Sequence, residues 1–290
     1  MKRFLAVLAA TLIAPTLVAA ATPAAAQTAP RDPVAAVKQQ IAKKRGVRID
    51  QTMRMVVGGK PLLNVRQKGL LRPSPRGVTA YDVKAGVAAD KDRVTMRIIH
   101  VNRRTYVQSP LLEDLPEGKK WVSTDEDFGV NGAGGYVDVL NPKVLKAVLA
   151  TTKSKVPGGR VDGVRTVAYR GAITLKQLAK ANPNLRELAR TYGKTKSPVL
   201  RWKLWVGARD RLPRRLTTSF EPMKDKTLGT FNLIDDVRLS DWGTRTPVKA
   251  PPAGQVIDVK DLASGEEILE EILIPFTDPF KGLKLDTVKQ

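Results

Sequence analysis

Hydrophobic residues recur at every second position along most of this chain, which is the period of strands with one buried face. In residues 48–57 that face includes Ile49, Met53 and Met55, and the Gly58-Gly59 pair predicts a tight hairpin turn. Further strand-like runs lie at 77–85, 93–101, 105–108, 120–123, 163–175, 200–206, 216–220 and 231–237. About ten strands joined mostly as hairpins predict one large antiparallel sheet, and a sheet of that size tends to curl.

A period of three to four residues marks a few short helices. Asp32 and Pro33 have the N-cap and first-turn chemistry of a helix that Gly46 ends. Asn141-Pro142 opens a second helix, expected over 142–152, and two more are expected at 175–181 and 183–192. Because these helices are able to cover the concave side of the sheet, the predicted fold is α+β: a single curved half-barrel with short helices in its concave mouth.

The first thirty residues differ from the rest of the chain. Lys2 and Arg3 precede an apolar run, and Ala24-Ala25-Ala26 before Gln27 is typical of a signal-peptidase site. We therefore expect residues 1–26 to be a cleaved signal peptide and the protein to be secreted, extracytoplasmic and soluble. Residues 27–262 are expected to form one domain, and residues 263–290 an acidic C-terminal extension that is loosely docked.

The chain is strongly basic, with a formal net charge of +22 at pH 7 that falls to +20 once Lys2 and Arg3 leave with the signal. Such a charge attracts anions, so transient contact with an anionic membrane or wall surface is expected. The basic residues are spread along the strands, as on the solvent face of an antiparallel sheet. We expect no nucleic-acid partner, and the sequence leaves the oligomeric state open.

Residues suited to catalysis are scarce. The chain has no cysteine and one histidine, which excludes thiolate metal sites and sites built from two imidazoles. That histidine, His100, lies on the apolar face of a strand and is interpreted as structural. Asp235 and Asp236 are neighbours in a strand and point to opposite faces, which is wrong for a shared carboxylate pair. We expect no catalytic residue, no metal and no cofactor.

A glycine-rich loop over residues 125–135 interrupts the strands. Asp125 and Asp127 resemble calcium ligands, but Gly129 and Val130 replace the next ligand and the turn glycine of a calcium loop. A polar turn is therefore the better interpretation. Because its glycines lower the cost of rearranging the backbone, we expect this loop and the helix at 142–152 to form a movable lid.

A series of short motifs follows the order found in one protein family. The motifs are Tyr106–Pro110, Leu115–Val122, the Asn141-Pro142 helix start, Gly163-Val164, Tyr169–Gly171, Lys203–Val206, Leu212–Arg215, Val237–Gly243 and Val256–Asp258. With them, residues 32–262 resemble the actinobacterial LppX/LprAFG lipoproteins, which are similar in fold to the LolA/LolB lipoprotein carriers. The resemblance implies an apolar cavity for acyl chains and no catalytic residues. Those lipoproteins are anchored through a cysteine at the cleavage site, where this chain has Ala26-Gln27.

The leading hypothesis is a secreted, non-catalytic carrier that binds a lipid or acylated glycolipid of the cell envelope in an apolar cavity. Burial of an acyl chain contributes about 0.8 kcal/mol per CH₂ without any polar chemistry. The candidate cavity residues are Met53, Met55, Ile98, Val144, Leu145, Val148, Leu149, Leu200, Trp202, Leu204, Phe231 and Leu233. Two alternatives stay open: a binding module for an anionic wall polymer or other polyanion, whose binding would fall steeply with salt, and an enzyme with an unrecognised site.

Overall fold

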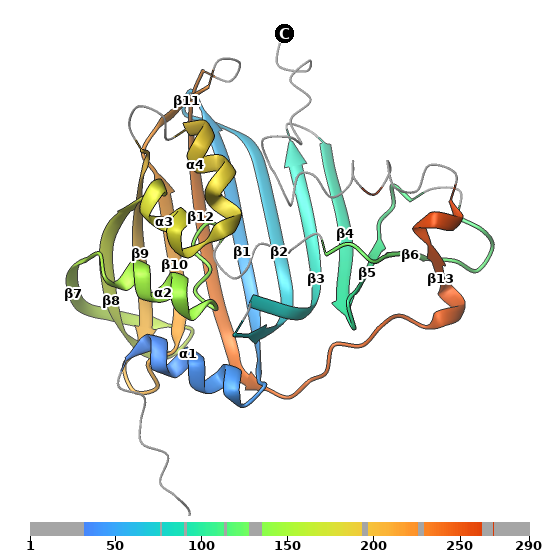
Figure 1. The fold of residues 1–290 in the computed structure, drawn as a ribbon, viewed down its shortest axis with the longest axis horizontal. Coiled ribbons are helices and arrows are strands. Elements are labelled where there is room, and N and C mark those ends of the chain that lie inside the picture. Colours follow the sequence, from blue (N-terminus) through green and yellow to red (C-terminus); the bar gives the residue numbers. More distant parts are fainter. Residues whose placement is uncertain are drawn as a thin grey trace, which may run out of the picture.

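The computed structural model describes residues 32–75, 77–89, 92–112, 115–127, 135–192, 197–225, 229–262 and 269. The expected signal peptide lies outside the described residues, as does the C-terminal extension apart from Leu269. The described strands form one large open sheet, and the longer helices lie together in front of one half of it (Figure 1). The fold prediction is confirmed by this open, curved, antiparallel-rich sheet with a few short helices on its concave side.

Within the part of the chain that the structure describes, the sheet has thirteen strands. They are β1 (Gly46–Val57), β2 (Lys60–Ser74), β3 (Gly77–Ala89), β4 (Asp92–Val101), β5 (Arg104–Gln108), β6 (Trp121–Thr124), β7 (Thr152–Val161), β8 (Val164–Thr174), β9 (Val199–Gly207), β10 (Pro213–Phe220), β11 (Met223–Asp225), β12 (Gly229–Thr244) and β13 (Val256–Asp258). Their order is β13-β6-β5-β4-β3-β2-β1-β12-β10-β9-β8-β7, with β11 paired to β12 off this path.

The helices begin where the sequence supplies caps. They are α1 (Pro33–Ala42), α2 (Pro142–Leu149), α3 (Leu175–Ala181) and α4 (Arg186–Tyr192), with short 3₁₀ turns at Pro183–Leu185, Ala253–Gln255 and Val259–Asp261. The Asp32 carboxylate accepts a hydrogen bond from the Ala35 amide at 2.8 Å, and Asn141 caps α2 through the Lys143 amide at 3.0 Å. Both cap predictions are therefore confirmed.

Strand register decides which residues face the helices. Met53 lies opposite Asp235, and Gln51 lies between Gln67 and Val237. Since directly paired residues share a face of the sheet, these side chains lie on the concave side with the apolar residues around them. The concave side, the buried faces of the helices and residues 136–140 together form one hydrophobic core.

The predicted end of the second helix is wrong. The helix stops at Leu149, where the hydroxyls of Thr151 and Thr152 donate hydrogen bonds to the carbonyls of Val148 and Leu149 at 2.7 and 2.6 Å. Residues 152–161 then form β7, a strand that the sequence does not reveal. It lies at the edge of the sheet and is almost wholly exposed, so it has no buried alternation, and an edge position tolerates its proline.

The chain returns to the sheet after the two prolines Pro251 and Pro252. Beyond these prolines the chain reaches the far edge of the sheet, where β13 pairs in parallel with β6 (Figure 1). The ion pair between Arg104 and Asp258, and the hydrogen bond from the Lys119 ammonium to the Val256 carbonyl at 2.9 Å, hold β13 in place. A three-residue strand is too short to show a period in the sequence.

Candidate functional site

The apolar residues proposed for a cavity converge on the concave side of the sheet. Eleven of the twelve belong to the main hydrophobic core, and the twelfth, Leu149, is half-buried against it. They come from both layers, since Met53, Leu204 and Phe231 lie on strands while Val144 and Val148 lie on α2. The structure thus brings all twelve into or against one hydrophobic core.

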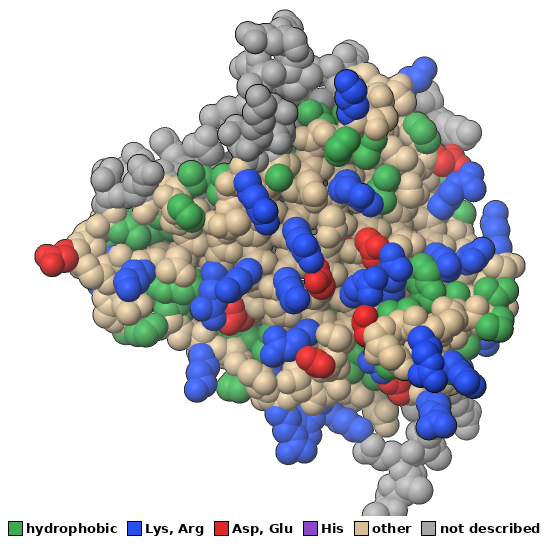
Figure 2. Space-filling model, turned by 180° about the vertical axis from the view of Figure 1, so that it is seen from behind, with side chains coloured by type: hydrophobic (Ala, Val, Ile, Leu, Met, Phe, Trp, Pro, Cys, Tyr) green, Lys and Arg blue, Asp and Glu red, His purple; other side chains and the backbone are tan. Residues whose placement is uncertain are grey.

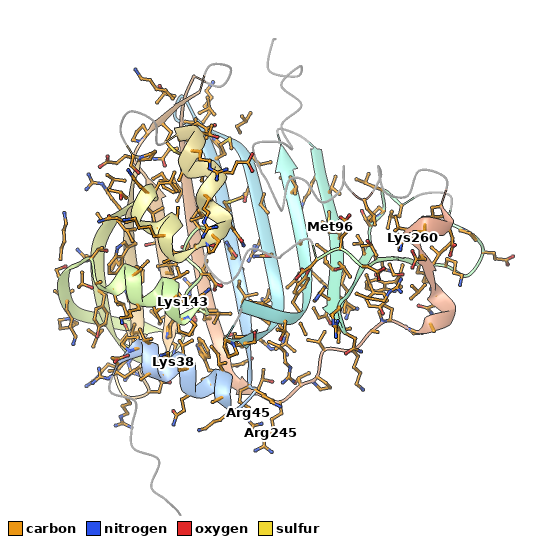
Figure 3. The ribbon with its side chains drawn as sticks, in the orientation of Figure 1. Lys38, Arg45, Met96, Lys143, Arg245 and Lys260 are labelled. Carbon is orange, nitrogen blue, oxygen red and sulfur yellow. The ribbon has the colours of Figure 1, made fainter. Side chains whose placement is uncertain are left out.

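The covering layer contacts the sheet through a few side chains. The Trp202 indole of β9 donates a hydrogen bond to the Thr151 hydroxyl, just after α2, at 3.1 Å. Tyr192 of α4 meets Phe231 edge-to-face at 5.8 Å between ring centroids, and Tyr136 meets Phe220 in the same way at 5.1 Å. The helices α1–α4 lie in front of the β7–β12 half of the sheet, whereas Met96 of β4 lies in the other half (Figure 3).

A polar chain crosses the middle of this apolar surface. The Gln67 amide donates to the Gln51 side-chain oxygen, and the Gln51 amide donates to both Asp235 oxygens at 3.0 and 3.1 Å. All three side chains are buried. A buried polar group is costly unless it is hydrogen-bonded, so these three stabilise one another inside a largely apolar surface.

Asp235 is the most perturbed group of this cluster. Its burial raises its pKa to about 7, and the hydrogen bond from Gln51 opposes that rise. The backbone of Gly135 lies directly against it, because a Cβ at Gly135 would stand 2.6 Å from an Asp235 oxygen. Gly135 has a φ of +54°, so glycine suits this position both by conformation and by space.

Sequence reasoning missed this cluster, although a signal was present. Gln51 and Gln67 occupy inward positions of alternating strands, and Asp235 alternates with Leu233 and Val237 on the inward face of β12. The prediction that Asp235 and Asp236 point to opposite faces is confirmed, since Asp236 pairs with Arg215 on the outer side at 2.9 Å. The alternation of residues along β12 is therefore enough to place the Asp235 carboxylate on the concave face. Only the pairing of the strands shows that Gln51 lies within hydrogen-bonding distance of it.

His100 has the structural role that the sequence indicates. It is buried, stacks on Tyr81 at 5.2 Å between ring centroids, and lies 2.9 Å from the Thr105 hydroxyl through its Nδ1. That hydroxyl donates to the Glu126 carbonyl at 2.6 Å, so the His100 Nδ1–H is the donor to it. Within the described ranges, no three His, Asp or Glu residues lie close enough to hold a metal ion. No helix among the described residues is long and apolar enough to cross a membrane.

The chain is similar to known proteins in structure only. No protein-family model matches the chain, and no curated protein matches it. The structure is similar to that of LprF from Mycobacterium bovis, with 16% identity over 76% of this chain and 97% of that chain and a TM-score of 0.42. It is also similar to a LolA superfamily protein from Nitrosomonas europaea, with 11% identity, 73% and 93% coverage, and a TM-score of 0.25.

Proposed function

We propose that this protein is an extracytoplasmic lipid carrier that holds a lipid or acylated glycolipid between the concave face of its sheet and the covering helices. The observation that supports this most is the convergence of apolar side chains from many separate segments on one face of the sheet, with α1–α4 lying over one half of it. An acyl chain bound there would replace contacts that the cover now makes, at a gain of about 0.8 kcal/mol per CH₂.

The covering layer suits reversible opening. α3 and α4 have seven residues each and α2 has eight, and helices of this length are held by packing rather than by their own stability. α2 packs against α1, α3 and β8, and its buried side chains belong to the same core as those of β9 and β12. Displacement of α2 from the sheet would expose Leu204 and Trp202 without unpairing any strand.

The polar chain through Gln51, Gln67 and Asp235 gives the apolar surface one place where a headgroup or ester oxygen can be hydrogen-bonded. Acyl chains would lie on either side of it, along the rows that contain Met55 and Leu204. This arrangement, a mostly apolar site with a few convergent polar groups, is common in small-molecule sites.

The proposal is tested by titration of delipidated protein with a fluorescent long-chain fatty acid. Binding should be saturable and should change by less than about twofold between low and high salt, because burial of acyl chains is not screened by ions. Leu204→Trp and Val148→Trp, which fill the site from its two sides, should weaken binding. Val156→Trp, which adds the same ring to the exposed edge strand β7, is the matched control.

Wild-type protein that does not bind the probe at any salt concentration would refute the carrier function. Binding that appears at low salt and disappears at high salt would instead favour the polyanion module. Thermal unfolding of each variant separates loss of the site from loss of the fold, and the wild-type result decides the matter even if a Trp variant does not fold.

A further inference from the structure

The outer face of the sheet carries a second feature, a basic cleft of about 1040 Å³ on the opposite side from the helices. Its floor is the outer surface of β2, β3 and β4, and its wall is the loop between β5 and β6. Figure 2 views this side of the molecule and shows Lys and Arg side chains over much of it, with fewer Asp and Glu. We name this feature the outer cleft.

Three cations stand in a row on the floor of the outer cleft. Lys68 of β2 pairs with Lys84 of β3, and Lys84 pairs with Arg97 of β4, so like charges lie directly opposite across two strand pairs. Such pairs destabilise a sheet. The cost remains in the native state unless an anion sits between them, and this arrangement therefore indicates an anion-binding surface.

The carboxylates Asp50 and Asp82 neutralise only some of the cations on this face. Asp82 holds Arg97 through two hydrogen bonds of 2.9 and 2.8 Å, and Asp50 lies 3.3 Å from Arg66 and 3.7 Å from Lys68. Lys84, at the centre of the row, makes no ion pair among the described residues.

Four more cations line the outer cleft around this row. They are Arg66, Arg93, Lys119 and Lys120, so that seven basic side chains and no carboxylate stand among the described residues that line the outer cleft. Gly86 lies between Arg66 and Thr95 on the floor and has no side chain to fill it. The outer cleft is therefore open and strongly positive at its base.

The wall of the outer cleft adds an apolar tip. Leu111 is 48% exposed and is one of two large hydrophobic residues that stand exposed among the described residues. Its neighbours Pro110 and Leu112 line the outer cleft, and Ser109 fixes the turn, since its hydroxyl accepts from the Leu111 amide at 3.2 Å. An exposed leucine beside a group of cations matches the interface of an anionic membrane, where headgroups meet acyl chains, better than it matches a soluble polyanion.

We propose that the outer cleft docks this protein on an anionic phospholipid surface, with lipid phosphates at Lys84 and its neighbours and Leu111 entering the headgroup layer. The proposal rests on the proposed function, because a lipid carrier has to meet the membrane that supplies or receives its lipid. It assigns the two tasks to opposite faces of one sheet: the concave face holds the lipid, and the outer face holds the membrane.

Vesicle sedimentation tests the docking surface. The protein should bind vesicles of phosphatidylcholine with about 30% phosphatidylglycerol and should not bind phosphatidylcholine alone, since anionic lipid supplies the attraction. Lys84→Ser with Lys120→Ser should weaken binding about tenfold or more. The control is Lys153→Ser with Lys224→Ser, which removes the same charge from exposed positions elsewhere and should change binding by less than about threefold.

Leu111→Ser separates a membrane from a soluble polymer. It should weaken vesicle binding severalfold and leave the binding of soluble polyphosphate unchanged. Equal losses in the two double-lysine variants would overturn the proposal by showing that the charge acts diffusely. The proposal would also be overturned, in favour of a polyanion site, by the following result. Leu111→Ser leaves vesicle binding unchanged, and the Lys84→Ser, Lys120→Ser variant loses polyphosphate binding.

The failure of this proposal is distinguishable from a failure of the carrier function. Fatty-acid binding by the Lys84→Ser, Lys120→Ser protein should equal that of the wild type, because these residues lie on the face away from the hydrophobic core. A protein that binds vesicles but no fatty acid would contradict the carrier function alone, and one that binds fatty acid but no anionic vesicles would contradict the docking surface alone.

Discussion

Asp235 is a carboxylic acid in a position that an apolar residue would fill in an ordinary sheet. Met53 lies opposite it on β1 and Thr218 on β10, and Gln51 is its hydrogen-bond donor. Because burial penalises the charged form, the pKa of Asp235 rises to about 7. The ionisation state of the concave face therefore changes in the range near neutrality.

The raised pKa of Asp235 determines how the free energy of unfolding changes with pH. An unfolded Asp titrates near about 4, so the native protein binds more protons than the unfolded chain between about pH 4 and 7. The free energy of unfolding should fall as pH rises through this range, by up to about 1.4 kcal/mol per pH unit from this one group. Asp235→Asn cannot ionise and should be stabilised relative to the wild type at pH 8 more than at pH 5.

Urea unfolding of both proteins at several pH values measures this difference. Asp138, whose pKa burial raises to about 6, is present in both proteins and cancels in the comparison. Parallel pH profiles for the wild type and Asp235→Asn would show that Asp235 does not titrate as its burial implies.

The contact of Gly135 with Asp235 gives a second prediction at this scale. Alanine at Gly135 would have a left-handed backbone and a Cβ 2.6 Å from the Asp235 carboxylate. Gly58→Ala is the control, since Gly58 has a φ of +56° with nothing within 4 Å of the added carbon. Gly135→Ala should lower the free energy of unfolding by about 1 kcal/mol more than Gly58→Ala. Equal losses, measured by urea unfolding, would show that the contact is not tight.

At the level of elements, the segment that leads into α2 reaches the polar chain, because Gly135 lies against Asp235. Val144, Leu145 and Val148 are fully buried on the inner side of α2, and Lys143 is exposed on its outer side (Figure 3). The predicted lid began at residue 125 and included three glycines of residues 128–134, which lie outside the described residues. Lid motion stays a prediction.

Amide hydrogen exchange tests that motion. Amides of α2 should exchange faster than those of the central strands β9 and β12, because a short helix can leave the sheet while strands paired on both sides cannot. Bound lipid should slow exchange in α2 more than in β12. Equal protection of helix and strands, with and without lipid, would mean that α2 is a fixed part of the core.

The elements that the sequence predicts well are those with a local signal. The cap at Asp32, the Gly58-Gly59 turn and the alternation of Leu200, Trp202 and Leu204 are each set by residues close in the chain. β7 and β13 could not be predicted in this way, since one is exposed on both faces and the other has three residues. The polar cluster depends on the pairing of Gln51 with a carboxylate 184 positions away, which no local pattern contains.

At the scale of the whole molecule, one sheet separates two chemistries. Its concave face is largely apolar around the buried chain of Gln67, Gln51 and Asp235, and its outer face is basic with a cleft at β2–β4. Part of the strong positive charge of the sequence therefore lies together on the outer face of the sheet. In the sequence, the basic residues are spread along the strands and indicate only a solvent-exposed face. In the structure, the register of three strands places Lys68, Lys84 and Arg97 in one row.

The expected acidic extension meets the core at one described position. Leu269 is helical and only 2% exposed, and it belongs to the main hydrophobic core. Loose docking of residues 263–290 stays a prediction. Leu269→Ser should lower the free energy of unfolding by about 2 kcal/mol or more, because it puts a hydroxyl in place of a buried apolar side chain. Urea unfolding of the variant checks this, and a loss below about 0.5 kcal/mol would indicate that the extension contributes nothing to the core.

Native mass spectrometry of the protein purified from its own host without detergent shows whether the concave face carries a lipid. A fraction of the molecules should carry an added mass that organic solvent extracts and that fragments to acyl chains, and Leu204→Trp should reduce this fraction while Val156→Trp should not. Uniformly empty wild-type protein, in a preparation that also fails to take up a fatty acid, would contradict the account.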